Sequence, residues 1–314
     1  MNESSCHDAR VAKRFVHARP RAHNLALYLL GLAGVLAWVE AGGRERWVEF
    51  ASAHGSFELI VYMGFALYLG WFWLLGAIYF ALDDLRDRAA ARAPEQRSRL
   101  GARLLRWEIQ QPEPDTARTR DVPRRELVEV VLRNQFLGTF PALLLLELLL
   151  RARGVEAHAP IPGPGQVLLQ LAGIILVLEL AFYSVHRALH HKQLFRRIHR
   201  VHHEFRKPTG IATHYVHYLE HLFGNLLPVF LGPVLLGAHP FVIMLWVVIA
   251  VFNAIHTHGG YAIPGLVYAH DHDFHHYRLR GNYGSLGLLD ALLRTNREFQ
   301  AEIRASQRVG QNEF

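Results

Sequence analysis

The stretch FYSVHRALHHKQLFRRIHRVHH, from Phe182 to His203, places six histidines within 22 residues, directly after an apolar run. A second cluster, HDHDFHH, follows from His270 to His276. Of the 21 histidines in the chain, 16 lie between His186 and His276, a concentration that composition alone does not produce. The fold must therefore bring many imidazoles together beside apolar segments.

The rest of the chain has the pattern of an integral membrane protein. It has 314 residues, 51% of them hydrophobic, and long apolar runs alternate with arginine-rich polar stretches. We predict an all-α membrane protein with about four transmembrane helices, a helical hairpin and a cytosolic histidine-rich helical cap. Each half of the hairpin is long enough for a short span or a re-entrant leg. The four spans and the hairpin are expected at residues 25–39, 59–82, 127–150, 167–185 and 222–255.

The charge of the loops predicts the orientation. The net charge is +7, and arginines crowd the loop 83–126, whereas the loops 42–57 and 151–165 carry few. Because basic loops stay in the cytoplasm, we expect the segment 1–24, the loop 83–126 and everything after Val185 on that side. The excess of arginine over lysine favours a bacterial inner membrane over the endoplasmic reticulum. We expect no nucleic-acid binding, because the chain has no nucleic-acid motif and no separate basic domain.

The single cysteine, Cys6, excludes several kinds of redox site. One thiol cannot build a disulfide framework, a zinc ribbon, a thiolate-ligated iron–sulfur cluster or a CxxCH haem attachment. No GxGxxG motif follows a strand pattern either. A redox enzyme made from this chain would therefore take its electrons from another protein.

The spacing of the histidines favours metal binding. Groups separated by three or four residues occur three times, at His186 and His190, at His199, His202 and His203, and at His272, His275 and His276. On a helix, these offsets place the imidazoles on one face, a turn apart. Neutral imidazole binds zinc, copper, iron and nickel. Eight rings are too many for one tetrahedral ion, so they suit two ions in one pocket.

The three motifs HRALHH at 186–191, HRVHH at 199–203 and HDFHH at 272–276 resemble those of the fatty acid hydroxylase/sterol desaturase superfamily of integral-membrane di-iron enzymes. Within that superfamily, the region 182–295 is most similar to C4-methylsterol monooxygenases. HRVHHEFRKPTG, HGGYAIP (from His258) and HDFHHYRLRGNYG carry this similarity. The resemblance implies a catalytic domain at 166–296, preceded by a transmembrane region at 25–165 and followed by a C-terminal tail at 297–314.

The resemblance implies two bound iron ions, for which zinc can substitute in purified protein, and O2 as co-substrate. The implied ligands are His186, His190, His199, His202, His203, His258, His272, His275 and His276. His217 is a tenth candidate, with a structural role as the alternative, because Tyr218 replaces the proline of the family pattern His-Pro-x-Glu. We predict no catalytic residue beyond the metal centre.

Other polar residues accompany the motifs. Glu179 precedes His186 by seven residues and shares its helix face, and a carboxylate inside a span is costly unless it is partnered. We predict that Glu179 and Asp273 support the ligands from behind, with helix packing as the alternative for Glu179. Whether His256 is a ligand stays open. His214, His217 and His221 form a further stripe that the family does not need.

The resemblance implies hydroxylation of an unactivated C–H bond of a membrane lipid, with a C4-methyl group of a sterol as the first candidate. The alternatives are a desaturase or hydroxylase of a fatty acyl, carotenoid or alkyl lipid and, from another class, a histidine-rich metal transporter. The implied electron donor is a ferredoxin, a Rieske-type reductase or a cytochrome b5-like protein. Arginines of the loop 86–125, with Arg196, Arg197 and Arg200, offer a basic docking face, although anionic lipids explain the same residues.

Overall fold

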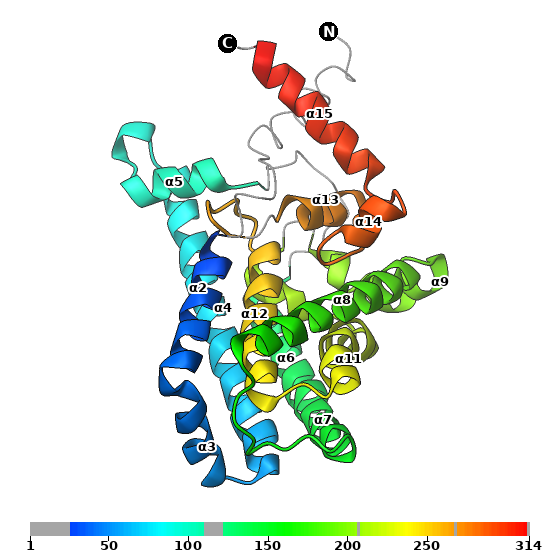
Figure 1. Cartoon of the computed structure of the whole chain (residues 1–314). Helices are drawn as coiled ribbons and strands as arrows, with labels where there is room; N and C mark the ends of the chain where they lie inside the picture. Colours follow the sequence, from blue (N-terminus) through cyan, green and yellow to red (C-terminus); the bar gives the residue numbers. More distant parts are fainter. Residues whose placement is uncertain (1–25, 110–121, 206–207, 267–268, 313–314) are drawn as a thin grey trace.

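The computed structural model describes residues 26–109, 122–205, 208–266 and 269–312, and these residues form helices joined by short loops (Figure 1). Six helical segments are long and apolar enough to cross a membrane. They are Ala26–Ser52, Glu58–Ala90, Arg124–Ala152, Pro164–Leu189, Tyr218–Leu236 and Pro240–His258. Four correspond to the predicted spans and two to the predicted hairpin, so the predicted all-α membrane architecture is confirmed.

Most of these spans are not uniform α-helices. The α-helices are α2 (Ala26–Trp38), α3 (Arg44–Ser52), α4 (Gly64–Ala90), α5 (Arg99–Trp107), α6 (Arg124–Asn134), α7 (Phe140–Ala152), α8 (Pro164–Leu189), α9 (Lys192–Leu194), α10 (Tyr218–Glu220), α11 (Leu227–Leu236), α12 (Pro240–His258), α13 (His270–Arg278), α14 (Leu288–Leu292) and α15 (Arg297–Asn312). Segments of π-helix lie at Val39–Gly43, Glu58–Met63, Gln135–Thr139, Phe195–His199 and His221–Leu226. Segments of 3₁₀-helix lie at Pro94–Gln96, His202–Glu204 and Gly210–His214.

The segment predicted as a loop at 42–57 is largely helical, which corrects that expectation. The chain turns at Gly42, whose φ of +98° a residue with a side chain rarely adopts, and α3 then begins at Arg44. Trp47 and Ala51, four residues apart, bury one face of α3, while its charged residues stay outside. The polar composition that indicated a loop is therefore that of an amphipathic helix.

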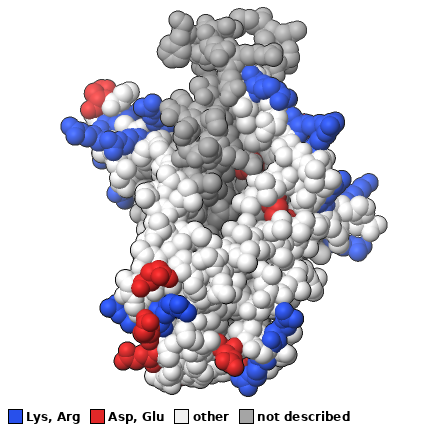
Figure 2. All heavy atoms as spheres, viewed as in Figure 1, with Lys and Arg blue, Asp and Glu red and all other residues white. Residues whose placement is uncertain are grey.

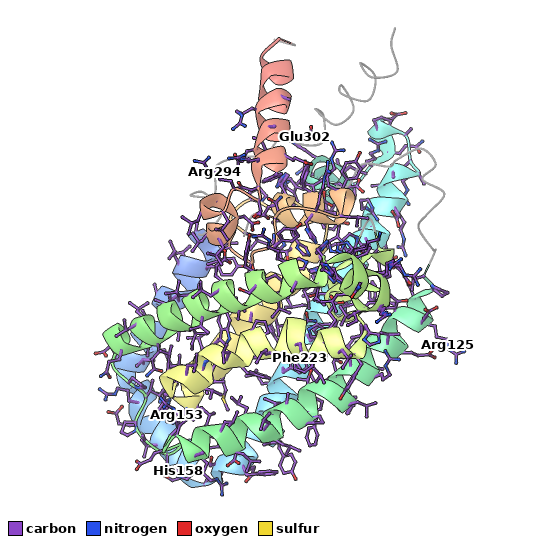
Figure 3. All side chains as sticks on the ribbon, turned by 90° about the vertical axis from the view of Figure 1, so that its right-hand side faces the viewer. Arg125, Arg153, His158, Phe223, Arg294 and Glu302 are labelled. Carbon is purple, nitrogen blue, oxygen red and sulfur yellow. The ribbon has the colours of Figure 1, made fainter. Side chains whose placement is uncertain are left out.

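The exterior of the helices is apolar, as a bilayer requires. Leu30 and Leu169, for example, are 68% and 73% exposed. In Figure 2 a broad belt without charged side chains separates two charged ends. Figure 3 places Arg294 and Glu302 at one end and Arg153 and His158 at the other. An exposed leucine surface of this kind is expected to face lipid.

Helix α8 packs closely on α11 because small residues let the two backbones approach. A Cβ atom at Gly232 would lie 2.9 Å from the Cα atom of Ile174, and one at Gly173 would lie 2.8 Å from Leu236. Glycines at helix–helix contacts are common in membrane proteins. This contact fixes α8, and the end of α8 carries His186 into the polar cap.

The cap consists of the short elements beyond the ends of α8 and α12. It includes α9, the two segments Phe195–His199 and His202–Glu204, and helices α13 and α14, and all lie towards the same end of the molecule (Figure 1). The predicted tail at 297–314 forms α15 in its described part. Of the predicted basic loop, residues 83–90 continue α4 and Arg99–Trp107 form α5, whereas 110–121 lie outside the described residues.

Candidate metal centre

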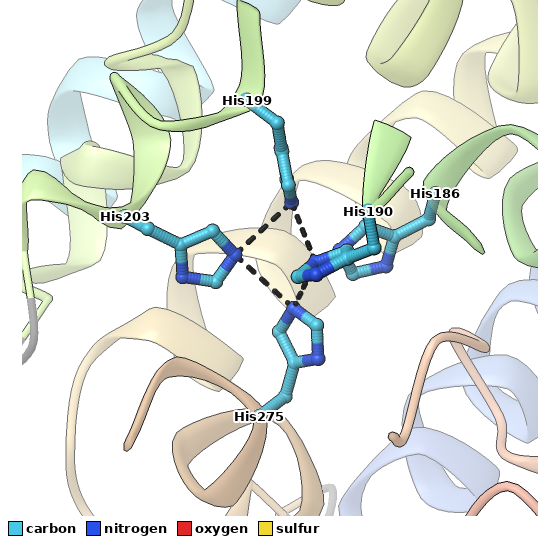
Figure 4. Close-up of side chains that lie close together, drawn as sticks. All are labelled: His186, His190, His199, His203 and His275. Carbon is cyan, nitrogen blue, oxygen red and sulfur yellow. Dashed lines mark hydrogen bonds between the residues drawn. The ribbon is translucent and has the colours of Figure 1, made fainter. Parts of the chain in front are cut away.

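One group of imidazoles converges at the end of α8. The group consists of His186, His190, His199, His203 and His275. Each ring offers one nitrogen as a possible ligand atom, and these five nitrogens all lie within 4.8 Å of one another. Four of the rings form a closed circuit of Nε2 atoms (Figure 4). The consecutive Nε2–Nε2 distances, from His190 through His199, His203 and His275 back to His190, are 2.9, 3.0, 3.2 and 3.1 Å.

A second group of four imidazoles lies beside the first. Its members meet the same 4.8 Å criterion and are His202, His258, His272 and His276. The Nε2 of His272 lies 2.9 Å from that of His258 and 3.2 Å from that of His276, and His258 lies 3.3 Å from His202. The ring centres of His203 and His276, one from each group, are 4.6 Å apart. The two groups therefore form one continuous centre.

The local structure that presents these rings is only partly the expected one. His186 lies in the last turn of α8 and His190 caps it, while His272, His275 and His276 share one face of α13. The middle motif does not lie on a single α-helix: His199 ends a π-helical segment, and His202 and His203 belong to a 3₁₀ segment. The winding changes from π to 3₁₀ between His199 and His202, and His199 and His203 belong to one group while His202 belongs to the other.

In five of the nine rings, a contact at Nδ1 decides which nitrogen points inward. The Nδ1 atoms of four ligands face backbone carbonyls, at 2.6–3.0 Å; the pairs are His186 with Tyr283, His258 with Ala254, His275 with Gly281, and His276 with Phe205. The Nδ1 of His199 lies 2.6 Å from Oε1 of Glu220. A carbonyl or a carboxylate accepts a hydrogen bond there, so Nδ1 of each of these five rings carries a proton, and a neutral ring then keeps its lone pair on Nε2.

Burial keeps these rings neutral. It is the main cause that lowers the pKa of His202, His203, His272 and His275 well below the usual range, and neighbouring imidazoles lower each pKa further. The pKa of His190 falls to about 3, mainly through burial and then through His199. Neutral rings with free Nε2 lone pairs are the form of histidine that binds metal.

This donor set fits two metal ions. Nine Nε2 atoms face one another across short distances, and five of the rings have no proton left to place between them. The other four rings of these contacts can place one proton each on Nε2, which serves at most four of the seven Nε2–Nε2 contacts at 2.9–3.3 Å. At the remaining contacts, lone pairs repel one another unless a cation lies between them. We conclude that the first group would hold one ion and the second group another, and that an all-nitrogen site suits zinc, copper, iron or nickel.

Glu220 is a functional residue that the sequence reasoning did not assign. It is buried and contacts the Nδ1 of His199, which is how a carboxylate commonly orients a metal-bound histidine. The sequence His217-Tyr218-Leu219-Glu220 carries a signal for this role, because the family pattern His-Pro-x-Glu also ends in glutamate.

His217, the tenth candidate ligand, lies outside both groups. Its Nδ1 accepts a hydrogen bond from the backbone N–H of Leu219 at 3.2 Å, which caps the short helix α10. The structure therefore favours the structural alternative for His217. His256 also lies outside both groups, and its Nδ1 is 2.5 Å from the hydroxyl of Tyr79.

Glu179 does not contact a ligand directly but holds the loop behind one. Its carboxylate accepts hydrogen bonds from the backbone N–H groups of Leu286 and Leu289, at 2.7 and 3.1 Å. The same loop carries the Tyr283 carbonyl that faces His186. Asp273 is buried on α13 between His272 and His275, and its supporting role stays a prediction.

A large apolar cavity leads to the two groups. Its volume is about 800 Å³, and residues of all six membrane-crossing segments line it, together with His186, His199, His202, His258 and His272. The walls are mostly leucine, isoleucine, valine and aromatic side chains. A long hydrocarbon can therefore lie inside the protein with one of its carbons beside the metal centre.

Comparison with known proteins agrees with this geometry. A family model described as fatty acid hydroxylase matches residues 171–295. The chain is 36% identical over 223 residues to a fatty acid hydroxylase of Mycosarcoma maydis. The aligned region covers 71% of this chain and 54% of the fungal protein. It is 31% identical over 188 residues to a putative methylsterol monooxygenase of Dictyostelium discoideum, and 32% identical over 194 residues to a very-long-chain aldehyde decarbonylase of Oryza sativa.

The last two matches cover 56% and 58% of this chain, and 69% and 72% of the respective relatives. The chain belongs to the fatty acid hydroxylase family, which is a family of oxygenase-type enzymes. It spans about half the length, 54%, of the fungal relative. No solved structure matches it.

We predict that the purified protein holds about two metal ions per chain and that each group can be emptied separately. The double variants His199→Ala/His203→Ala and His272→Ala/His276→Ala should each retain about one ion, because each removes two ligands from a different group. Metal content is measured by plasma mass spectrometry on monodisperse protein. Retention of both ions by either double variant would contradict the assignment.

We predict that Glu220→Gln weakens metal binding about 10- to 100-fold, because an amide orients the Nδ1–H of His199 less strongly than a carboxylate. Chelator titration of the metal-loaded protein measures this change. His217→Ala is the matched control: it removes a neighbouring helix cap, costs about 1 kcal/mol of stability, and should leave the metal affinity unchanged. Loss of metal in the control would instead make His217 a ligand.

Proposed function

We propose that the protein is a membrane-bound non-haem di-iron oxygenase that hydroxylates an unactivated C–H bond of a lipid. One observation carries this proposal: nine imidazoles converge, and five of them line an apolar cavity of about 800 Å³ that lies between the membrane-crossing helices. The family match, and relatives whose names describe hydroxylases and monooxygenases, support it.

The reaction balances only with an external electron donor. Hydroxylation consumes a C–H bond, one O2, two electrons and two protons, and it yields an alcohol and water. When bound, two iron ions would supply the reduction and cleavage of O2. The nine histidines would hold them, with the Nδ1 contacts to carbonyls and to Glu220 fixing the rings.

The chain itself contributes positioning and exclusion of water. The cavity walls bury a hydrocarbon, and the transfer of apolar surface from water stabilises the complex by about 25 cal/mol per Å². Dry walls also protect a reactive oxidant from side reactions with solvent. The helices therefore position the lipid so that one of its unactivated carbons lies beside the metal centre.

The first candidate substrate is a sterol with a C4-methyl group. The methylsterol monooxygenase relatives favour it, whereas the fungal fatty acid hydroxylase and the plant aldehyde decarbonylase support an acyl or alkyl lipid as the alternative. A metal transporter should carry ligands midway along its spans. Within the described ranges, both metal-capable groups instead lie at helix ends, in the cap.

The electron donor is proposed to be an acidic redox protein that docks beside His199. Lys192, Arg196, Arg197 and Arg200 are exposed, and Arg200 directly follows that ligand. Figure 2 shows basic side chains gathered where α9 lies in Figure 1. Complementary charge speeds the association of such partners. The cytoplasmic orientation of this face and the bacterial inner membrane stay predictions; the relatives compared above are eukaryotic.

The proposed activity is tested with purified protein loaded with iron, a ferredoxin with its reductase, O2 and a panel of 4-methylsterols, fatty acyl lipids, carotenoids and alkyl lipids. We expect a product 16 mass units heavier than its substrate, with the oxygen derived from ¹⁸O2. Loss of two mass units would show a desaturase. The chelated protein is the control, and the absence of any O2-dependent product from the whole panel would refute the proposal.

The docking face has its own test. Arg196→Glu/Arg197→Glu should raise the KM for an acidic ferredoxin about 10-fold or more at low salt, with a smaller effect at high salt. The kcat at saturating donor should change little, because neither side chain touches a ligand. Arg44→Glu/Arg46→Glu, on α3 at the far end of the molecule, is the matched control. Equal effects of the two charge reversals would argue against docking at Arg196 and Arg197.

A further inference from the structure

The cavity lining includes neutral polar side chains that belong to neither metal-capable group. Four of them, Tyr68, Thr213, His214 and Asn225, we call the polar wall. His214 is also part of the histidine stripe for which the family resemblance gave no role.

His214 is held firmly in this wall. Its Nδ1 lies 2.9 Å from the hydroxyl of Tyr68, and the ring of Phe72 stacks on it at 4.8 Å with an interplanar angle of 20°. The side-chain amide of Asn134 donates hydrogen bonds to the backbone carbonyls of His214 and Val216, at 3.1 and 2.9 Å. The orientation of the imidazole is therefore set by contacts on three sides.

One nitrogen of this ring is left for a ligand. With Tyr68 at Nδ1, the Nε2 of His214 carries no hydrogen bond to the residues that the structure describes, although the side chain is only 8% exposed and lines the cavity. Burial, and then His221, lowers the pKa of His214 well below its usual range, so the ring is neutral.

A hydroxyl group is the natural partner for this nitrogen. If Tyr68 donates to Nδ1, the proton is on Nε2, and a hydroxyl oxygen can accept it. If Nδ1 donates to Tyr68 instead, a hydroxyl can donate to the bare Nε2. A hydroxyl thus satisfies His214 in either tautomer, whereas a carbonyl satisfies only one.

The charge of the cavity argues for a neutral head group. The described residues that line it include no lysine and no arginine, and its ionisable groups other than histidine and tyrosine are Glu220 and Asp271. A carboxylate or a phosphate at the polar wall would be buried without a cationic side chain to pair with it, which is costly. An alcohol carries no such penalty.

The polar wall lies near the metal-binding end of the cavity. Glu220, which contacts His199, lines the cavity together with Thr213 and His214, and the ring centre of His214 lies 4.9 Å from that of His221, the residue after Glu220. We propose that His214, held by Tyr68, binds the hydroxyl group of a neutral lipid alcohol, and that oxidation falls on a carbon close to that hydroxyl. The position of oxidation rests on the proposed function; the binding site does not.

Binding without turnover tests the site. The full-length protein in lipid nanodiscs is titrated with two matched pairs of probes, cholestanol with cholestane and 1-octadecanol with octadecane. We expect at least one alcohol to bind about 10-fold more tightly than its hydrocarbon, the value of one buried hydrogen bond. Equal affinities within both pairs would overturn the proposal.

Variants then locate the hydrogen bond. His214→Leu should abolish the preference for the alcohol without weakening hydrocarbon binding, and His214→Gln, which keeps an N–H donor, should restore part of it. Tyr68→Phe should weaken the preference through loss of the Nδ1 contact, and it decides the matter if His214→Leu does not fold. Each variant must keep the metal content of the unmodified protein.

The matched control is Tyr28→Phe. Tyr28 lines the same cavity, and its buried hydroxyl has no hydrogen-bond partner in the part of the chain that the structure describes. The same chemical change there should leave the preference for the alcohol intact. If Tyr28→Phe abolishes the preference and His214→Leu does not, the hydroxyl of the lipid binds at Tyr28 and the proposal is wrong.

Failure of this inference is distinguishable from failure of the proposed function. A protein that oxidises a lipid at a carbon remote from its hydroxyl, located by fragmentation mass spectrometry, would refute the inference and leave the oxygenase intact. A protein that binds the alcohol through His214 but never consumes O2 would uphold the binding site and refute the oxygenase.

Discussion

The structure depends on one electrostatic constraint: buried nitrogen lone pairs that face one another require a cation between them. The rings meet in seven Nε2–Nε2 contacts of 2.9–3.3 Å, more than their remaining protons can bridge, so some lone pairs would repel each other in a buried interior. A bound metal converts this repulsion into coordination. Much of the cap therefore serves to hold Nδ1 protons in hydrogen bonds that point away from the centre. The Nε2 lone pairs of those rings are then left to bind a metal.

That device is built mainly from backbone. His275 and His186 face the carbonyls of Gly281 and Tyr283, and this loop is in turn fixed by carboxylates. Asp290 accepts hydrogen bonds from the N–H groups of Tyr283 and Gly284, while Glu179 holds Leu286. Gly281 is required because its φ is +72° and a Cβ would lie 2.6 Å from the Thr295 carbonyl. Glu179 of α8 thus helps to position His186 indirectly, because it holds the loop whose Tyr283 carbonyl contacts that ring.

The sequence predicted the helical membrane architecture and the histidines that converge, because both depend on local patterns. Apolar length determines a span, and spacings of three and four determine a face, as for His272, His275 and His276 on α13. It could not predict the π and 3₁₀ segments that divide the middle motif, since they depend on packing in the cap. Backbone carbonyl partners such as Tyr283 leave no mark in side-chain identity. For His217, the family pattern indicated a possible ligand, but Nδ1 is used to cap α10.

The position of the metal centre follows from two requirements that conflict. In the proposed oxygenase, a lipid C–H bond would be reached best from within the bilayer, where the cavity walls are apolar, whereas a separate electron donor would approach from the aqueous side. The ends of α8 and α12 satisfy both, because His186 and His258 face the cavity while the segment after α8 turns outward. His199 lies at this boundary: Glu220 holds it on the cavity side, and the exposed Arg200 follows it on the outside. A centre midway along the spans would be equally dry but would lie far from any soluble electron donor.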